Sequence, residues 1–317
     1  MIITPIENKY YDCQMANIAT IATSYKREFY LAFMPAFYFD YNAGHNKLVG
    51  DCIHTYCPDG VYSDSIPPLT FHGIHLCITP CEDRLSALSV IDEGIANNLP
   101  IVVSSDCYHC HWSVFYRKRH LKHMILLDRK VDRSYVAYDP YFTTDMLMIR
   151  EENLFLHNNT VFAFTIMPEP KIDNCILKRE LSRCIANYSQ AEISIRDKGI
   201  QISQAIINVC IEKELEGTIG VYDIPLLRKL KDLEFNRILY LEMLTKIDKL
   251  HGVRCLDVCE TLRHLIGLWR YIRRVLLKCC IKRSLRGKES EVEQVFTQIF
   301  CCEQAIASEL YNRFQEQ

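Results

Sequence analysis

The sequence lacks an excess of charge of either sign. Its 37 Lys and Arg residues nearly balance its 39 Asp and Glu residues, so the formal net charge is -2 at pH 7. A protein that binds nucleic acid or an anionic membrane through its overall charge is expected to be strongly basic. The composition therefore does not indicate that the protein binds nucleic acid or an anionic membrane through its overall charge.

Long hydrophobic runs are also missing. No apolar run approaches the roughly 20 residues that a helix needs to cross a bilayer. The opening residues, MIITPIENKYYDC, contain neither the basic segment nor the apolar segment of a secretory signal. We therefore expect a cytoplasmic protein.

Cysteine, in contrast, is abundant, with 16 residues in a chain of 317. In a reducing compartment such cysteines act as small buried hydrophobic side chains rather than as a disulfide framework. Cys279 and Cys280, and likewise Cys301 and Cys302, lie within helical patterns, which favours that interpretation.

The first part of the chain has the hydrophobic pattern of a mostly antiparallel sheet. Short apolar runs predict strands at 99–103, 124–127, 135–138, 146–149 and 161–166. A helix is predicted over 81–98, after a loop-rich stretch over 50–80. The aromatic segment 33–41 is predicted to be a strand or an extended wall.

The proline-containing segment 168–170 marks the clearest boundary, and long amphipathic helices are predicted beyond it. These helices span approximately 172–187, 198–215, 223–250, 255–282 and 288–315. The fold class is therefore α+β. We expect an N-terminal domain with an antiparallel sheet over 1–168 and an all-α helical bundle over 171–317.

A histidine and an aspartate flank two neighbouring predicted strands. His123 opens the strand at 124–127, and Asp139 closes the strand at 135–138. Antiparallel pairing of these strands brings both residues to the same end of the sheet. His120 is a rival to His123, but residues three apart on an extended segment face opposite sides, so we expect only one of them to serve as the base.

This pair lacks a nucleophile, and Cys13 is the strongest candidate. Cys13 opens a segment with a roughly helical period. The N–H groups at a helix N-terminus favour a thiolate and can also stabilise an oxyanion. The alternative is an ordinary buried helix cysteine. The predicted catalytic triad is Cys13, His123 and Asp139, with the thiolate attacking, the imidazole moving the proton and the carboxylate fixing the tautomer.

Several elements together match a known family pattern. They are Asp12-Cys13 at a helix start, the aromatic run Phe37-Tyr38-Phe39-Asp40-Tyr41, the strand Leu99-Pro100-Ile101-Val102-Val103, Asp106-Cys107-Tyr108, Tyr116, His120, His123, and Tyr138-Asp139-Pro140-Tyr141-Phe142. With this pattern and the helical second domain, the chain resembles the papain-like cysteine acyltransferases of the BtrH (butirosin biosynthesis) type. It is also similar to transglutaminase-like amide synthases of the CtaG (closthioamide biosynthesis) type.

The resemblance implies an amide synthase of natural-product biosynthesis. Cys13 would take an acyl group from the phosphopantetheine thioester of an acyl or peptidyl carrier protein, and His123 would then deprotonate an amine acceptor that attacks the acyl-enzyme. This chemistry needs no ATP and no cofactor on the enzyme. The candidates for substrate binding are Tyr38, Tyr41, Asp106, Tyr108 and His120. For Tyr38 and Tyr41 the alternative is packing in the core.

One position departs from the papain-like pattern, which usually has a glutamine six residues before the cysteine to donate to the oxyanion. Glu7 stands there, and an ionised carboxylate accepts instead of donating. Asn8, one residue further on, and Gln14 are the candidate donors.

The segment Cys107-Tyr108-His109-Cys110-His111 fits the C-x-x-C-H pattern of c-type haem attachment. That chemistry normally requires export. A zinc site would need a second ligand pair, and Cys52 with Cys57 or Cys77 with Cys81 have poor spacing for it. We expect that the segment 107–111 binds no metal and forms a loop beside the catalytic strand.

The segment 269–288 is basic and has no acidic residue. Arg270, Arg274, Lys278 and Lys282 fall on one helical stripe. Because carrier proteins are typically acidic, this stripe is a candidate docking surface. A solvated helix face is the alternative, and nucleic-acid binding is a weaker one.

Two other functions remain open. The first is a papain-like cysteine peptidase, similar to the leader peptidases that cut after double-glycine motifs. The second is a non-catalytic Cys/His metal-binding module, which would hold metal and have no reactive thiol.

Overall fold

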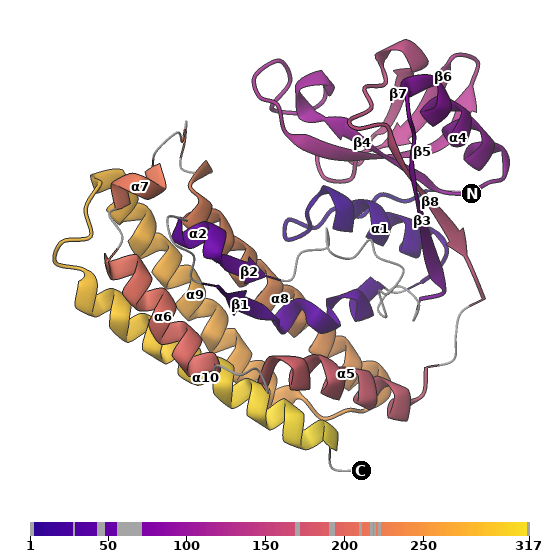
Figure 1. Cartoon of the computed structure of the whole chain (residues 1–317). Coiled ribbons are helices and arrows are strands. Elements are labelled where there is room, and N and C mark those ends of the chain that lie inside the picture. Colours follow the sequence, from indigo (N-terminus) through magenta and orange to yellow (C-terminus); the bar gives the residue numbers. More distant parts are fainter. Residues whose placement is uncertain are drawn as a thin grey trace. The chain divides into compact units, whose positions relative to one another are not determined.

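The chain forms two compact units. The computed structural model describes residues 3–27, 29–42, 48–55, 72–168, 172–189, 194–208, 211–215, 218, 220 and 223–315. The first unit comprises Met1–Ala32 and Pro58–Lys171, and the second comprises Phe33–Cys57 and Ile172–Gln317 (Figure 1). The segment Phe33–Cys57 thus belongs to the helical unit, although the sequence predicts it as part of the sheet domain.

A six-stranded antiparallel sheet with the order β3-β8-β4-β5-β6-β7 forms the centre of the first unit. The strands are β3 (Ile74–Pro80), β4 (Ile101–Asp106), β5 (Lys122–Val131), β6 (Ser134–Tyr138), β7 (Met146–Arg150) and β8 (Thr160–Ile166). The five predicted strands are confirmed. β3 is an edge strand in the stretch predicted to be loop, and its final residue, Pro80, is a residue type that edge strands tolerate.

The helix α4 (Arg84–Ala96) covers one face of this sheet and confirms the helix predicted over 81–98. Its Ile91 packs with Ile125 and Leu127, all essentially inaccessible to solvent. Full burial of each such side chain contributes about 1.5–3 kcal/mol. Asp83 caps the helix, since its carboxylate accepts from the Ser86 N–H at 2.8 Å.

The helix α1 (Cys13–Ser24) runs beside β5 and is attached to it by a buried amide. The Asn17 Nδ2 group donates to the Cys13 carbonyl at 2.8 Å and to the Met124 carbonyl at 3.0 Å. Because Met124 follows His123 directly, this bond holds the start of α1 next to the start of β5.

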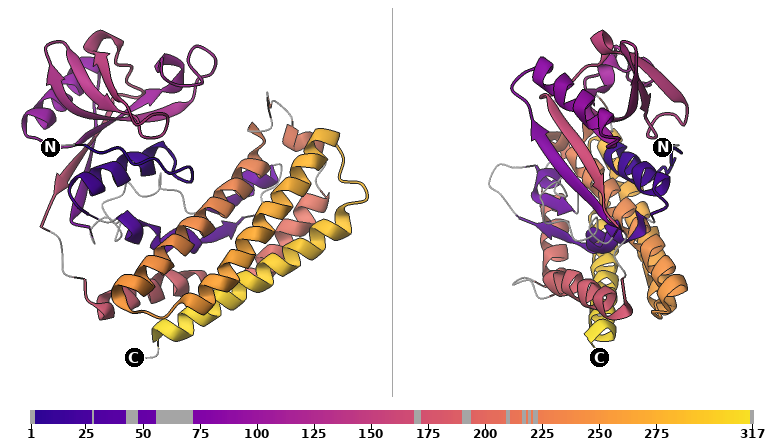
Figure 2. Two further views of the ribbon diagram at one scale, coloured as in Figure 1. Left: turned by 180° about the vertical axis from the view of Figure 1, so that it is seen from behind. Right: turned by 90° about the vertical axis from the view of Figure 1, so that its right-hand side faces the viewer.

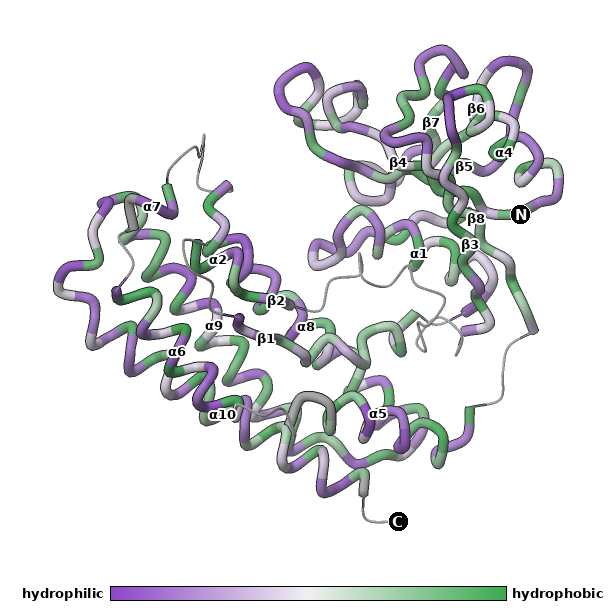
Figure 3. Tube along the Cα trace, in the orientation of Figure 1, coloured by the Kyte–Doolittle hydropathy of each residue, from purple (hydrophilic) through white to green (hydrophobic). Residues whose placement is uncertain are grey.

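The second unit is built on three long helices, which lie side by side in Figure 2: α8 (Pro225–His251), α9 (Leu256–Lys282) and α10 (Glu289–Gln315). The shorter α5 (Asn174–Ser189), α6 (Ile195–Asn208) and α7 (Ile211–Leu215) accompany them. The helices predicted over 172–187, 223–250, 255–282 and 288–315 are confirmed, whereas two helices, α6 and α7, replace the single helix predicted over 198–215. Apolar and polar bands alternate along each long helix, as expected for amphipathic packing (Figure 3). No helix in the described ranges combines the length and the apolar character needed to cross a membrane.

The aromatic segment is mostly helical rather than extended. A 3-10 helix spans Phe29–Phe37, and only β1 (Phe39–Tyr41) is a strand, paired antiparallel with β2 (Ile53–Thr55). The prediction of an extended segment over 33–41 is therefore wrong for most of its length. Successive residues Phe33 and Met34 are both buried, so the segment lacks the alternation of a half-buried strand.

A buried ion pair ties this segment to the long helices. Arg237 of α8 and Glu303 of α10 are fully buried and form two hydrogen bonds of 2.8 and 3.0 Å. Arg237 also donates to the Ala36 carbonyl at 2.9 Å, and the Trp269 indole donates to Glu303 at 2.9 Å. The pair is therefore well satisfied by hydrogen bonds, as a buried ion pair must be.

Removal of one partner is expected to be costly. Glu303→Ala leaves the Arg237 charge buried, and we expect the free energy of unfolding to fall by about 3–5 kcal/mol. Urea denaturation followed by circular dichroism measures this loss. Glu309→Ala, which breaks an exposed ion pair with Arg313 on the same helix, should cost less than about 1 kcal/mol. Equal losses in the two variants would contradict a structural role for the buried pair.

Candidate active site

Cys13 is the first residue of α1. Asp12 forms the N-cap, with its carboxylate accepting from the Met15 N–H at 2.7 Å and its carbonyl from the Ala16 N–H at 3.0 Å. This capping fixes where the helix begins and places Cys13 at its first position. The Cys13 thiol is free and partly exposed, so it is accessible to a substrate.

The predicted histidine and aspartate are in contact. His123 is the second residue of β5 and pairs with Ser105 of β4, and Asp139 follows the last residue of β6. The His123 Nε2 atom lies 2.7 Å from Asp139 Oδ2, with side-chain exposures of 2% and 1%. Because Nε2 faces the carboxylate, Nδ1 is the ring nitrogen left for a thiol.

Two thiols lie beside the His123 ring. Burial alone would lower the His123 pKa, but hydrogen bonds to Asp139, Cys107 and Cys13, together with the Asp139 charge, hold it well above its usual value. The imidazolium form is therefore favoured next to Cys13. Within the first unit the structure brings Cys13, His123 and Asp139 together, as the sequence analysis expects for a catalytic triad.

Trp112 and Cys107 are neighbours of the triad that the sequence analysis did not assign to it. The Trp112 indole donates to Asp139 Oδ2 at 2.5 Å, so one buried carboxylate oxygen serves both Trp112 and His123. Cys107 is almost fully buried, unlike Cys13. No sequence signal marks Trp112, because its position depends on how the loop after β4 folds back.

The candidate oxyanion donors lie on either side of Cys13. The Asn8 side-chain oxygen accepts from the Tyr10 N–H at 3.0 Å, which forms the turn that leads into α1. Gln14 follows Cys13 in the first turn of α1, with its side chain buried, and Glu7 is exposed. The choice between Asn8 and Gln14 stays a prediction.

His120 belongs to a second, more exposed pair. Its Nδ1 atom lies 2.7 Å from Asp106 Oδ2, and its ring stacks on Tyr108 with centroids 4.2 Å apart. Burial raises the Asp106 pKa, but hydrogen bonds from the Tyr108 N–H, His120 and the Leu121 N–H lower it below its usual value. Asp106, Tyr108 and His120 therefore form one cluster.

The remaining binding candidates lie in the second unit. Tyr38 is 38% exposed, and Tyr41 in β1 is buried, which favours core packing for Tyr41. On α9, Arg270 pairs with the buried Glu234 at 2.8 Å. Arg274, Lys278 and Lys282 are exposed, so this part of the predicted stripe is open to solvent.

No metal centre forms among the residues that the structure describes, since no group of three or more His, Cys, Asp or Glu side chains is arranged to hold an ion. Cys107 and Cys110 are buried in the first unit, Cys77 lies in β3, and Cys52 lies in the second unit. Cys57, the other predicted partner, lies outside the described residues.

No protein-family model matches this chain, and a search of curated proteins also gives no match. The arrangement of Cys13, His123 and Asp139 is therefore the strongest indication of function.

The raised His123 pKa links stability to pH. The charged His123 imidazole stabilises the folded state, and this contribution is fully present at a pH below the pKa of His123 in the unfolded chain, near 6.5. The contribution is lost as the pH rises through the higher pKa of His123 in the folded protein. Asp139→Asn removes the carboxylate that holds the pKa up. We expect an NMR titration to show a lower His123 pKa in this variant, and urea denaturation to show a wild-type advantage that shrinks with rising pH.

The control for that titration is Asp106→Asn, which removes the carboxylate beside His120 instead. It should leave the titration of His123 close to that of the wild type. An unchanged His123 pKa in Asp139→Asn would contradict the pairing of these two residues.

Thiol labelling tests whether His123 activates Cys13. At pH 6 only about 0.3% of an ordinary thiol with a pKa near 8.5 is ionised, so iodoacetamide reacts slowly with it. We expect His123→Gln to slow the labelling of Cys13 by about tenfold or more, as measured by peptide mapping. The exposed Cys77 serves as an internal control whose rate should not change. Equal slowing of both cysteines would point to a general effect on the fold.

Proposed function

We propose that this protein is a papain-like cysteine acyltransferase that transfers an acyl group from a carrier-protein thioester to an amine. The observation that carries the proposal is the buried His123–Asp139 pair, 2.7 Å apart, with the Cys13 thiol hydrogen-bonded to the same imidazole. Nucleophilic acyl transfer requires a thiol in contact with an imidazole that is itself in contact with a carboxylate.

The first half of the reaction forms the acyl-enzyme. The reaction starts from the ion pair in which the Cys13 proton has already passed to His123, and the thiolate attacks the carbonyl carbon of the donor thioester. The N–H groups of the first turn of α1 favour the resulting oxyanion. The intermediate collapses with loss of the carrier thiol, which takes the proton from His123.

The second half forms the amide. An amine takes the place of the carrier thiol and attacks the acyl carbon while His123 accepts its proton. The Cys13–acyl bond breaks, and the proton returns to the sulfur. Because the thioester already carries the required energy, no ATP is consumed. Water competes with the amine, and the rings of Tyr141 and Phe142, 5.9 and 4.9 Å from that of His123, provide partial apolar cover.

The carrier protein would dock on the exposed cations of α9. Arg274, Lys278 and Lys282 are exposed along the helix, and an acidic carrier complements them. Such exposed charges affect the rate of association more than the final affinity, and their effect falls with rising salt.

Intact-protein mass spectrometry tests acyl transfer directly. After incubation with a simple acyl thioester, such as an octanoyl thioester of N-acetylcysteamine, we expect a mass increase of one acyl group on the wild type and none on Cys13→Ala. Addition of an amine should discharge the adduct and release an amide. Cys107→Ala is the matched control and should still acylate, because Cys107 is buried beside the same histidine.

Other outcomes separate the alternatives. An adduct that water discharges faster than any amine, together with cleavage of peptide substrates, would favour a cysteine peptidase. Acylation at Cys107 instead of Cys13 would overturn the assignment of the nucleophile. If the wild type forms no adduct and instead binds zinc stoichiometrically, a metal-binding module would be favoured.

A further inference from the structure

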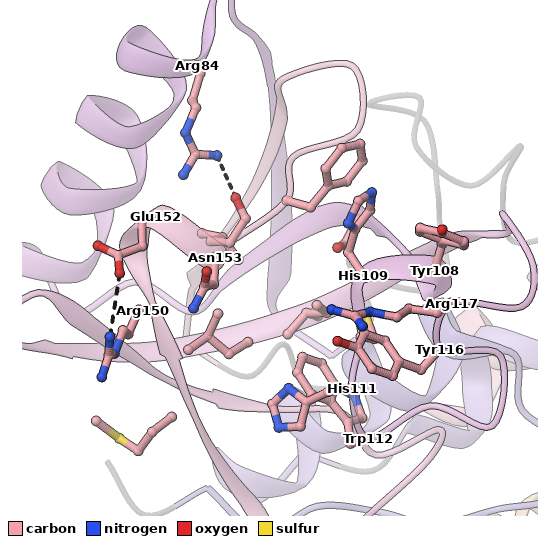
Figure 4. A pocket seen from close by; sticks show the side chains of 17 residues that line it. Arg84, Tyr108, His109, His111, Trp112, Tyr116, Arg117, Arg150, Glu152 and Asn153 are labelled. Atoms are coloured by element: carbon pink, nitrogen blue, oxygen red, sulfur yellow. Dashed lines mark hydrogen bonds and ion pairs between the residues drawn. The ribbon is translucent and has the colours of Figure 1, made fainter.

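The first unit contains a cavity outside the proposed triad, although Tyr108, a candidate for substrate binding, is part of its wall. Its volume is about 700 Å³, and its walls come from α4, the loop after β4, β7 and the segment 151–155 (Figure 4). Cavities of about 300–1,000 Å³ accommodate small organic ligands. Neither Cys13, His123 nor Asp139 lines it, so it is distinct from the reacting thiol.

Positive charge dominates the walls of this cavity. Figure 4 shows Arg117 on one side and Arg84 and Arg150 on the other. Glu152 is the sole acidic residue among the described residues that line it, and it lies 3.6 Å from Arg150. The walls therefore carry more positive than negative charge.

Arg117 is the best placed of these cations to receive a ligand. It has no carboxylate partner in the described part of the first unit, and its guanidinium lies over the Tyr116 ring, 5.1 Å from the centroid. Its backbone has φ = 54°, which is uncommon for residues other than Gly and Asn, and its N–H donates to the Tyr108 carbonyl at 3.1 Å. This hydrogen bond fixes the loop backbone at Arg117.

Flat side chains form much of the remaining wall. His109 stacks on Phe155 with centroids 4.2 Å apart, and Trp112 and Tyr116 face the same space. A bare inorganic anion would fill little of the volume. The cavity thus combines cations with planar apolar surface, the two features that favour a ring bearing an acidic group.

We propose that this cavity binds a small molecule that carries a phosphate or a carboxylate on a planar ring. Arg117 contacts the anionic group, and the ring lies against Trp112 and Tyr116. Guanidinium groups suit this role because their planar donors match phosphate and carboxylate oxygens. The proposal does not depend on catalysis by Cys13.

The chain provides its own optical probe for this site. It contains 2 tryptophans, of which Trp269 is fully buried in the second unit, so Trp112 is the one that a ligand in the cavity contacts. Titration of the full chain with phenyl phosphate is expected to change the tryptophan fluorescence in a saturable manner. For a ligand this small we expect a dissociation constant of roughly millimolar.

Related probes define which parts of the ligand matter. Inorganic phosphate and benzyl alcohol each retain one half of phenyl phosphate, and both should bind at least about tenfold more weakly. Phenylacetate replaces the phosphate by a carboxylate, and its affinity relative to phenyl phosphate shows which anion the site prefers. Benzyl alcohol binding as tightly as phenyl phosphate would overturn the role of the cations.

Two arginine variants locate the site. Arg117→Ala should weaken phenyl phosphate at least about tenfold by calorimetry. Arg129→Ala removes the same charge from β5, outside the cavity, and should leave the affinity unchanged. Trp112→Phe should abolish the fluorescence change while calorimetry still detects binding. Equal affinities in the two arginine variants, or no saturable signal from the wild type, would overturn the proposal.

Discussion

One buried carboxylate oxygen holds the candidate active site together. Asp139 Oδ2 accepts from both His123 and Trp112, and the Asp139 side chain itself is inaccessible to solvent. An isolated charge in such a place would be very unfavourable, so the two donors stabilise the carboxylate there. The end of β6 supplies the oxygen, the start of β5 supplies the imidazole, and the loop after β4 must fold back to supply the indole. The geometry of three separate segments thus depends on the hydrogen bonds that Asp139 Oδ2 accepts.

The backbone ladder gives this arrangement its rigidity. His123 pairs with Ser105 within a sheet whose core is closed to solvent, and Asn17 fixes the helix that carries Cys13 to the next residue of the same strand. Cys13 and His123 therefore share one rigid support. A site built in this way needs little reorganisation before it reacts, which is an advantage when charge develops during the reaction.

The parts of the structure with regular periodicity were predictable from the sequence, and the parts that depend on tertiary contacts were not. The runs around Ile125 and Val136 and the long helices have clear periods, and the approach of His123 to Asp139 follows from pairing two strands. β3 escaped prediction because Pro80 and nearby glycines resemble loop signals. Trp112 escaped because an indole gives no local sign of its acceptor, which lies 27 positions away in the chain. Asn17 did give a signal, as a polar residue within an apolar helix.

The two units share the chain in an interleaved way, because Phe33–Cys57 belongs to the second while the residues on both sides of it belong to the first. The polypeptide passes from one unit to the other near residues 32, 57 and 171. Neither unit is a continuous stretch, so no single cut separates them into complete pieces. During synthesis, Phe37 and its neighbours emerge long before Arg237 and Phe300, the residues that bury them. The helical unit must therefore await the end of translation to close its core, which leaves an early aromatic segment that chaperones would be expected to protect.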